Sequence, residues 1–195
     1  GVKKIARILA KVFNEKMVLQ KQRCGLRVND NTCMYTFTSE DEFTMQVGLA
    51  KAKKFGSIIS GDTTLQTRLE DGKYLLAISD GMGSGPDARK SSKIAIKTLE
   101  RLLQSGFNND TALKLVNTTI SANTDEDMYA TLDVSILDLY KSNMKFIKNG
   151  ACPTFVKRGG NVETLKSVSL PTGILNNIDL VELRPSRRRY SCNVQ

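Results

Sequence analysis

The pattern of apolar and polar positions predicts a helix first and strands after it. Apolar residues recur at helical spacing near the start of the chain, at Val2, Ile5, Ala6, Leu9, Val12 and Phe13. From residue 43 onward apolar and polar residues alternate, at Phe43, Met45, Val47 and Leu49, which predicts a half-buried strand. Residues 57–60 and the apolar run 74–78 predict two more strands, with an Asp71-Gly72 hairpin turn before the second.

Two helices are predicted between residues 85 and about 122. Gly85-Pro86 is typical of a helix start, and Gly106 of a helix end. Asn109 or Asp110 is expected to cap the second helix. One apolar face runs along each helix and should pack on a sheet; its members are Ala88, Ser92, Ala95, Ile96, Leu99, Leu102, Leu103, Leu113, Val116 and Ile120.

Strands resume after these helices. Alternation over residues 132–136, and the segments 143–148 and 154–157, predict a meander, whereas the tail 184–195 is predicted to be unstructured. The order of elements along the chain is strands, then two helices, then strands again. This order indicates an α+β fold with helices packed on antiparallel sheet, and not the alternating order of a doubly wound fold. We expect residues 1–16 to be a linker helix that joins an upstream region, and residues 17–195 to form one domain.

Composition and charge narrow the class of protein. The 195 residues suffice for one domain, and 40% hydrophobic with 25% charged residues is ordinary for a globular protein. The net charge of +9 is scattered, which favours a solvated surface or attraction of an acidic or phosphorylated partner. No nucleic-acid-binding motif accompanies it. Cys24, Cys33, Cys152 and Cys192 lack C-x-x-C spacing, so neither a zinc ribbon nor a redox dithiol is indicated. No signal peptide is recognisable, so reduced thiols in a cytoplasmic domain are predicted.

Two aspartates beside glycines carry the candidate chemistry. They occur in Ser60-Gly61-Asp62 and in the segment Ser79-Asp80-Gly81-Met82-Gly83-Ser84-Gly85. The chain has no histidine, which excludes a Ser-His-Asp triad and histidine-ligated zinc. Either aspartate alone would indicate only a turn. Strands joined by a hairpin can bring both to one edge, where carboxylates and the Gly81 carbonyl suit Mg²⁺ or Mn²⁺.

A dinucleotide-binding turn is the alternative interpretation of this glycine-rich segment. Residues 83–88 match G-x-G-x-x-A between a strand and a helix. However, another helix follows at residue 109 where that fold would place a second parallel strand. Asp80 would also repel a pyrophosphate unless a metal ion lay between them.

At these residues the sequence resembles the metal-dependent serine/threonine phosphatases of the protein phosphatase 2C type. Within that type it is most similar to the group represented by the phosphatase domain of stage II sporulation protein E. The resemblance covers nearly the whole chain and is carried by five segments, residues 56–62, 77–85, 129–139, 150–158 and 170–174. It implies a four-layer αββα sandwich with a two-ion Mn²⁺ or Mg²⁺ centre at one end of the sheets.

The resemblance also implies roles for individual residues. Asp62 matches a metal-bridging aspartate, and Asp80 with the Gly81 carbonyl matches the next metal-binding pair. A metal-bound water is the implied nucleophile, so no side chain is assigned as catalytic. Asp133 lies in a matching segment, but we interpret it as structural. The implied substrate is phosphoserine on a small cytoplasmic protein, a phosphorylated anti-anti-sigma factor of bacterial sporulation. A homodimer, and an upstream membrane region absent from this sequence, are left open.

The sequence departs from the family pattern near its end. The family has a later Asp-Gly metal motif, whereas the only acidic residues here after residue 173 are Asp179 and Glu182. We interpret the sequence as truncated at its C-terminus, and we expect this chain to be a poor phosphatase. The alternative hypothesis is a catalytically impaired domain of the same fold that binds a phosphoprotein without turnover.

Overall fold

The computed structural model describes residues 1–24, 32–52, 59–83, 85–122, 129–173, 179–183 and 190–194. It divides into two compact units. Unit 1 holds residues 1–45 and 139–141, and unit 2 holds residues 46–138 and 142–195. The predicted domain boundary after residue 16 stays a prediction. No helix in the described part of the chain is both long and apolar enough to cross a membrane.

The described part of unit 1 consists of a helix and a two-stranded antiparallel sheet. The helix is α1 (Val2–Phe13), and the strands are β1 (Met17–Cys24) and β2 (Cys33–Ser39). Asn14 ends α1 in a left-handed conformation with φ 54°. No residue of α1 is buried, so its apolar stripe does not form a core within this unit.

A disulfide joins the two strands of this sheet. Cys24 and Cys33 stand directly opposite each other in the β1–β2 register, with their Cα atoms 4.0 Å apart. The prediction that the cysteines are reduced thiols is therefore wrong for this pair. Spacing along the sequence could not indicate it, because strand pairing brings the two residues together. Cys152 is a free, exposed thiol.

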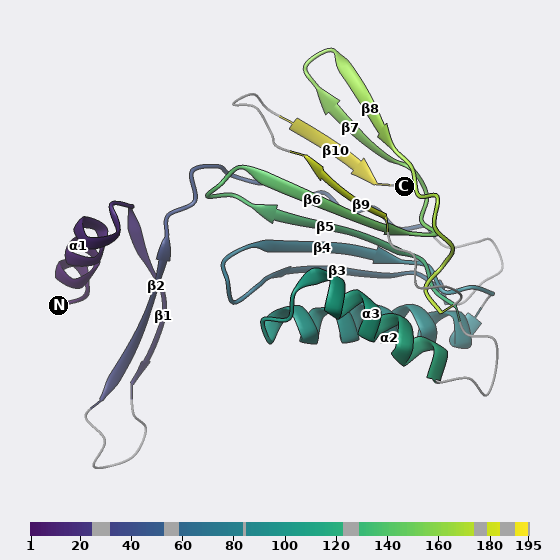
Figure 1. Cartoon of the computed structure of the whole chain (residues 1–195), viewed down its shortest axis with the longest axis horizontal. Helices are drawn as coiled ribbons and strands as arrows, with labels where there is room; N and C mark the ends of the chain where they lie inside the picture. The colour runs from purple at the N-terminus through teal and green to yellow at the C-terminus, as the bar shows by residue number, and fades with distance from the viewer. Residues whose placement is uncertain are drawn as a thin grey trace. The chain divides into compact units, whose positions relative to one another are not determined.

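Within the described residues, unit 2 contains two antiparallel sheets and two helices (Figure 1). The larger sheet has the order β3-β4-β5-β6-β9, and the smaller has the order β10-β7-β8. The strands are β3 (Thr63–Arg68), β4 (Tyr74–Ser79), β5 (Leu132–Asp138), β6 (Asn143–Asn149), β7 (Thr154–Arg158), β8 (Asn161–Leu165), β9 (Asp179–Leu183) and β10 (Tyr190–Val194). The helices are α2 (Gly85–Gln104) and α3 (Asn109–Ala122). The predicted α+β class is thus confirmed.

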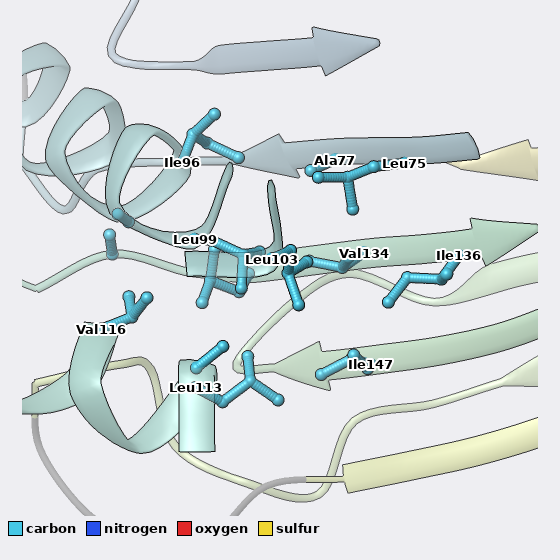
Figure 2. Packing of buried hydrophobic residues seen from close by; sticks show 14 of the residues in the cluster. Leu75, Ala77, Ile96, Leu99, Leu103, Leu113, Val116, Val134, Ile136 and Ile147 are labelled. Atoms are coloured by element: carbon cyan, nitrogen blue, oxygen red, sulfur yellow. The ribbon is translucent and has the colours of Figure 1, made fainter. Parts of the chain in front are cut away.

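Helices α2 and α3 cover one face of the larger sheet through a single apolar core (Figure 2). Alternate residues of β5 point toward the helices, which is the strand periodicity of two. Leu99 of α2 and Val116 of α3 are fully buried in this core. The predicted helix faces are correct, and Leu102 packs against the core while only partly buried. Other core members include Leu75, Ala77, Ala95, Ile96, Leu113, Leu132, Val134, Ile136 and Ile147.

A buried ion pair lies on the opposite face of the larger sheet. Asp133 of β5 and Lys148 of β6 are cross-strand neighbours, and the Lys148 ammonium donates to the Asp133 carboxylate. Lys148 also donates to the Thr154 hydroxyl at 2.7 Å, and that hydroxyl donates to Asp133 at 3.1 Å. Because Thr154 belongs to β7, this cluster connects the two sheets. The structure thus places Asp133 in the interior, where it contacts Lys148 and Thr154.

Three local predictions are wrong. Residues 43–49 form no strand, and Val47 and Leu49 are 39% and 66% exposed, because no described strand pairs with this segment. In the tail, residues 190–194 form β10 through pairing with β7, whereas residues 184–189 and 195 lie outside the described residues. The cap of α3 is Asn108, whose side-chain oxygen accepts from the Thr111 amide at 2.8 Å. The predicted turn at Asp71-Gly72 and the helix end at Gly106 are confirmed, both glycines having positive φ.

Leu99→Ala should lower the free energy of unfolding by about 2–5 kcal/mol, because it leaves a cavity in a fully buried site. Leu115→Ala is the matched control, since Leu115 is 39% exposed and should cost far less. Urea unfolding followed by circular dichroism measures both. Equal stability of the parent and the Leu99 variant would contradict the assigned helix face.

Lys148→Met should destabilise the protein by roughly 3–5 kcal/mol, because it leaves the Asp133 carboxylate buried without its cation. Combining it with Asp133→Asn should restore part of that loss, since no unpaired charge is then buried. A double-mutant cycle from urea unfolding of the four proteins measures the coupling. Simple additivity of the two single changes would show that the ion pair does not couple the strands.

Candidate metal centre

The two predicted aspartates meet at one edge of the larger sheet. Asp62 directly precedes β3 and Asp80 directly follows β4. These strands are antiparallel with Thr63 opposite Ser79, so the adjoining aspartates lie at the same sheet edge. The hairpin geometry expected from the sequence is present, although Asp62 precedes a strand instead of following one. Residues 57–58 of the expected preceding strand lie outside the described residues.

Local hydrogen bonds orient Asp62. The Ser60 hydroxyl donates to Asp62 Oδ2 at 2.9 Å, and the Asp62 amide donates back to Ser60 Oγ at 3.3 Å. Lys51 Nζ donates to the Asp62 carbonyl oxygen at 2.7 Å. An exposed ammonium group therefore lies beside the aspartate backbone.

Asp80 is fixed by the backbone that leads into β5. Its amide donates to Thr131 Oγ1 at 2.9 Å, and its carbonyl accepts from the Thr131 amide at 2.8 Å. The next residue, Gly81, forms a β-bridge with Ala130, which bridges in turn to Thr172. Three segments far apart in the sequence thus converge around the Asp80 backbone.

The start of α2 packs directly on this edge. A Cβ atom on Gly81 would lie 1.7 Å from the Ala88 carbonyl oxygen, so no other residue fits there without moving the helix. Ser92 of α2 is fully buried, and its hydroxyl donates to the Gly61 carbonyl at 2.5 Å. Ser92 Oγ also lies 2.7 Å from Thr63 Oγ1. Helix α2 is therefore anchored to both aspartate segments.

The donor atoms gather around Gly61. A Cβ atom on Gly61 would lie 3.6 Å from Asp80 Oδ1, 3.4 Å from the Gly81 carbonyl oxygen and 3.1 Å from the Ala88 Cβ, so both oxygens border the position that a side chain would occupy. Partial burial, together with hydrogen bonding and repulsion from the Asp62 carboxyl, raises the pKa of Asp80 to about 6. Two carboxylates and a carbonyl are the donors that Mg²⁺ and Mn²⁺ prefer, so these residues fit such an ion. Among the described residues, no cluster of three or more His, Cys, Asp or Glu side chains forms a larger site.

Comparison with known proteins decides the family. The family model for stage II sporulation protein E matches residues 70–187. The chain belongs to this family. It is 34% identical over 176 residues to stage II sporulation protein E of Priestia megaterium, covering 90% of this chain and 30% of that protein. It is 36% identical over 176 residues to the Bacillus subtilis (strain 168) protein, covering 90% of this chain and 21% of that one. The chain thus spans less than a third of either relative.

Solved structures show the same fold. The structure of the PP2C phosphatase domain with a fragment of the regulatory domain of SpoIIE from Bacillus subtilis superposes with a TM-score of 0.72 at 35% identity. The match covers 94% of this chain and 54% of that one. RsbX, crystallised in complex with magnesium, superposes with a TM-score of 0.61 at 16% identity over 72% of this chain and 68% of that one. The fold is therefore that of PP2C-type phosphatase domains, as the sequence predicted.

Sequence reasoning missed the residues that position the aspartates. Ser92 is a polar residue on an otherwise apolar helix face, which is a detectable signal of a buried hydrogen bond. Thr131 precedes a strand and shows its role only when that strand pairs with β4. Lys51 lies 11 residues before Asp62 and carries no local signal at all.

Gly81→Ala should destabilise the domain by at least about 1–3 kcal/mol, because the added methyl group would overlap the backbone of α2. Gly160→Ala is the matched control, since nothing lies within 4 Å of its Cβ position. Thermal unfolding compares the two. A Gly81 variant as stable as the control would contradict the close approach of α2.

Asp80→Asn should stabilise the metal-free protein at neutral and alkaline pH. A raised pKa means that the folded state binds the Asp80 proton more tightly than the unfolded state does. The protonated carboxyl therefore contributes stability that is fully present below pH 3.8 and is lost as the pH rises through about 6. The asparagine variant does not lose this stability, because its side chain stays uncharged at every pH. Melting temperatures in a chelator should therefore show a gain over the parent at about pH 8 that shrinks toward about pH 4. Equal melting temperatures of the parent and the variant at about pH 8 would contradict this prediction.

Proposed function

We propose that this chain is a metal-dependent protein phosphatase domain that hydrolyses phosphoserine or phosphothreonine. The meeting of Asp62 and Asp80 at one sheet edge, with the Asp80 carboxylate and the Gly81 carbonyl next to Gly61, is the observation that carries the proposal. Family membership supports it, since the Bacillus subtilis relative is described as a PP2C phosphatase domain. The proposed metal ligands are Asp62, Asp80 and the Gly81 carbonyl oxygen, for two Mn²⁺ or Mg²⁺ ions.

The chain's own residues would bind and orient the phosphate group. The Ser60 hydroxyl orients the Asp62 carboxylate, and Thr131 fixes the Asp80 backbone, so the segments that carry both carboxylates are in place before a cation binds. When bound, divalent ions offset phosphate charge and lower the pKa of a bound water. Lys51 places a further positive charge beside the Asp62 backbone, where it can attract a phosphate dianion.

The proposed substrate is a phosphoserine of a small regulatory protein of the anti-anti-sigma factor type in sporulation. It comes from the sequence resemblance, and the sporulation proteins to which this chain is similar support it. A cytoplasmic location, which includes the cytosolic domain of a membrane-anchored protein, belongs to the same proposal.

A second candidate function is phosphoprotein binding without turnover. The small number of carboxylates at the candidate metal centre favours this function, because no cluster of three acidic side chains forms among the described residues. A site with fewer carboxylates offsets less of the charge of two divalent ions and should bind the second ion weakly. Such a domain would retain metal-dependent binding of a phosphoserine peptide but release no phosphate.

Release of phosphate from a phosphoserine peptide by the full chain, with Mn²⁺ titrated from zero, separates the two functions. Asp62→Asn and Asp80→Asn should each lower kcat/KM by at least roughly 100-fold, since even partners of metal ligands contribute about 10–100-fold. Asp71→Asn is the matched control and should retain parental activity. Peptide binding without release by the parent would favour the binding domain. Full activity of either site variant would refute the assigned ligands.

A further inference from the structure

Helix α2 carries a row of basic residues along its solvent-exposed side. Arg89, Lys93, Lys97 and Arg101 recur at intervals of four, and all four are exposed. This basic row is one ridge of the helix, about 18 Å long at 1.5 Å per residue. Lys90 adds a fifth exposed positive charge next to it. The scattered charge seen in the sequence is therefore partly collected on one surface.

Few acidic side chains offset this row within the helix. The acidic residues of α2 are Asp87 in the first turn and Glu100. Lys97 pairs with Glu100 at 2.6 Å, and the Glu100 side chain is only 20% exposed. The other side of α2 is buried in the core, so the helix is fixed in position and cannot turn these charges elsewhere.

The basic row begins beside the candidate metal centre. Its first member, Arg89, follows Ala88, whose backbone fills the space next to Gly81 and whose Cβ would lie 3.1 Å from a Cβ on Gly61. From there the row leads away from the aspartates along the helix. A chain whose phosphorylated residue lies at Asp62 and Asp80 can therefore extend along it.

We propose that the basic row on α2 docks an acidic segment that flanks the phosphorylated residue of a protein substrate. This proposal rests on the proposed function and deepens it by naming the substrate class. Charge complementarity supports it, and so does spacing. Two residues four positions apart on a helix are separated by about 6 Å along its axis, and two alternate residues of an extended chain are separated by about 6.6 Å. Acidic residues at every second position of an extended segment thus match the row.

Other anionic partners fit this surface less well. Single-stranded nucleic acid binds through aromatic stacking platforms as well as charge, and α2 contains no aromatic residue. A helix that lies on a membrane inserts an apolar face, whereas the apolar face of α2 is buried in the protein core. An acidic polypeptide needs only the charges that the row presents.

The test uses the full chain and two fluorescein-labelled phosphoserine peptides of equal length. One carries glutamates at alternate positions on one side of the phosphoserine, and the other carries glutamines there. The row variant is Lys93→Gln/Lys97→Gln/Arg101→Gln, which leaves Arg89 beside the centre intact. The matched control is Lys114→Gln/Lys157→Gln/Lys166→Gln, which removes the same charge from exposed residues elsewhere. Fluorescence anisotropy in a chelator measures binding without turnover.

The parent and the control should bind the acidic peptide at least about tenfold more tightly than the neutral one at low salt, a difference of about 1.4 kcal/mol. The row variant should bind both peptides within about twofold of each other, and added salt should remove the parent's preference. Equal binding of both peptides by the parent would overturn the proposal. Equal losses in the row variant and the control would also overturn it, because net charge alone would then explain binding.

Two further measurements complete the test. Tighter row-dependent binding of a single-stranded oligonucleotide, or of phosphatidylglycerol vesicles, than of the acidic peptide would assign the row to that partner and overturn the proposal. Hydrolysis of p-nitrophenyl phosphate with Mn²⁺ reports on the metal centre alone and should be unchanged in the row variant. If the parent does not hydrolyse p-nitrophenyl phosphate, the proposed phosphatase function is refuted. The anisotropy comparison would still show whether the basic row binds the acidic segment.

Discussion

The buried ion pair of Asp133 and Lys148 constrains the rest of unit 2. Burial raises the pKa of the Asp133 carboxyl, while the hydrogen bonds from Lys148 and Thr154 act in the opposite direction. A charge can stay in this interior only with its partners in place, so β5, β6 and β7 must adopt one register. Thr131 directly precedes β5 and bonds to the Asp80 backbone, so the position of β5 also fixes one of the two aspartates.

Local signals in the sequence were sufficient for the parts of the fold that short-range chemistry determines. Helix α2 begins and ends where glycine and proline predict, and the apolar faces of both helices lie in the core. The start of α3 differs from the prediction, because its cap is Asn108. The Asp71-Gly72 turn makes β3 and β4 a hairpin, which brings Asp62 and Asp80 to one edge. This part of the candidate site followed from two short motifs and one turn.

Features that depend on pairing between distant segments were not predictable in this way. The Cys24–Cys33 disulfide follows from the β1–β2 register, and β10 is a strand because β7 lies beside it. Residues 43–49 show the converse, since regular alternation produced no strand without a described partner. The contacts of Thr131 and Ser92 with the aspartate segments likewise depend on which elements pack together.

The position of α2 and α3 between two neighbouring strands has a kinetic consequence. β4 and β5 pair directly, yet residues 80–131 separate them along the chain, so their pairing closes a long loop. Loop closure costs conformational entropy before any contact repays it, whereas the helices and the β3–β4 hairpin form from local contacts. The joining of β5 to β4 is therefore the step that should limit the rate of folding. Changes in β5 should slow folding, while changes on the exposed helix surface should leave that rate unaltered.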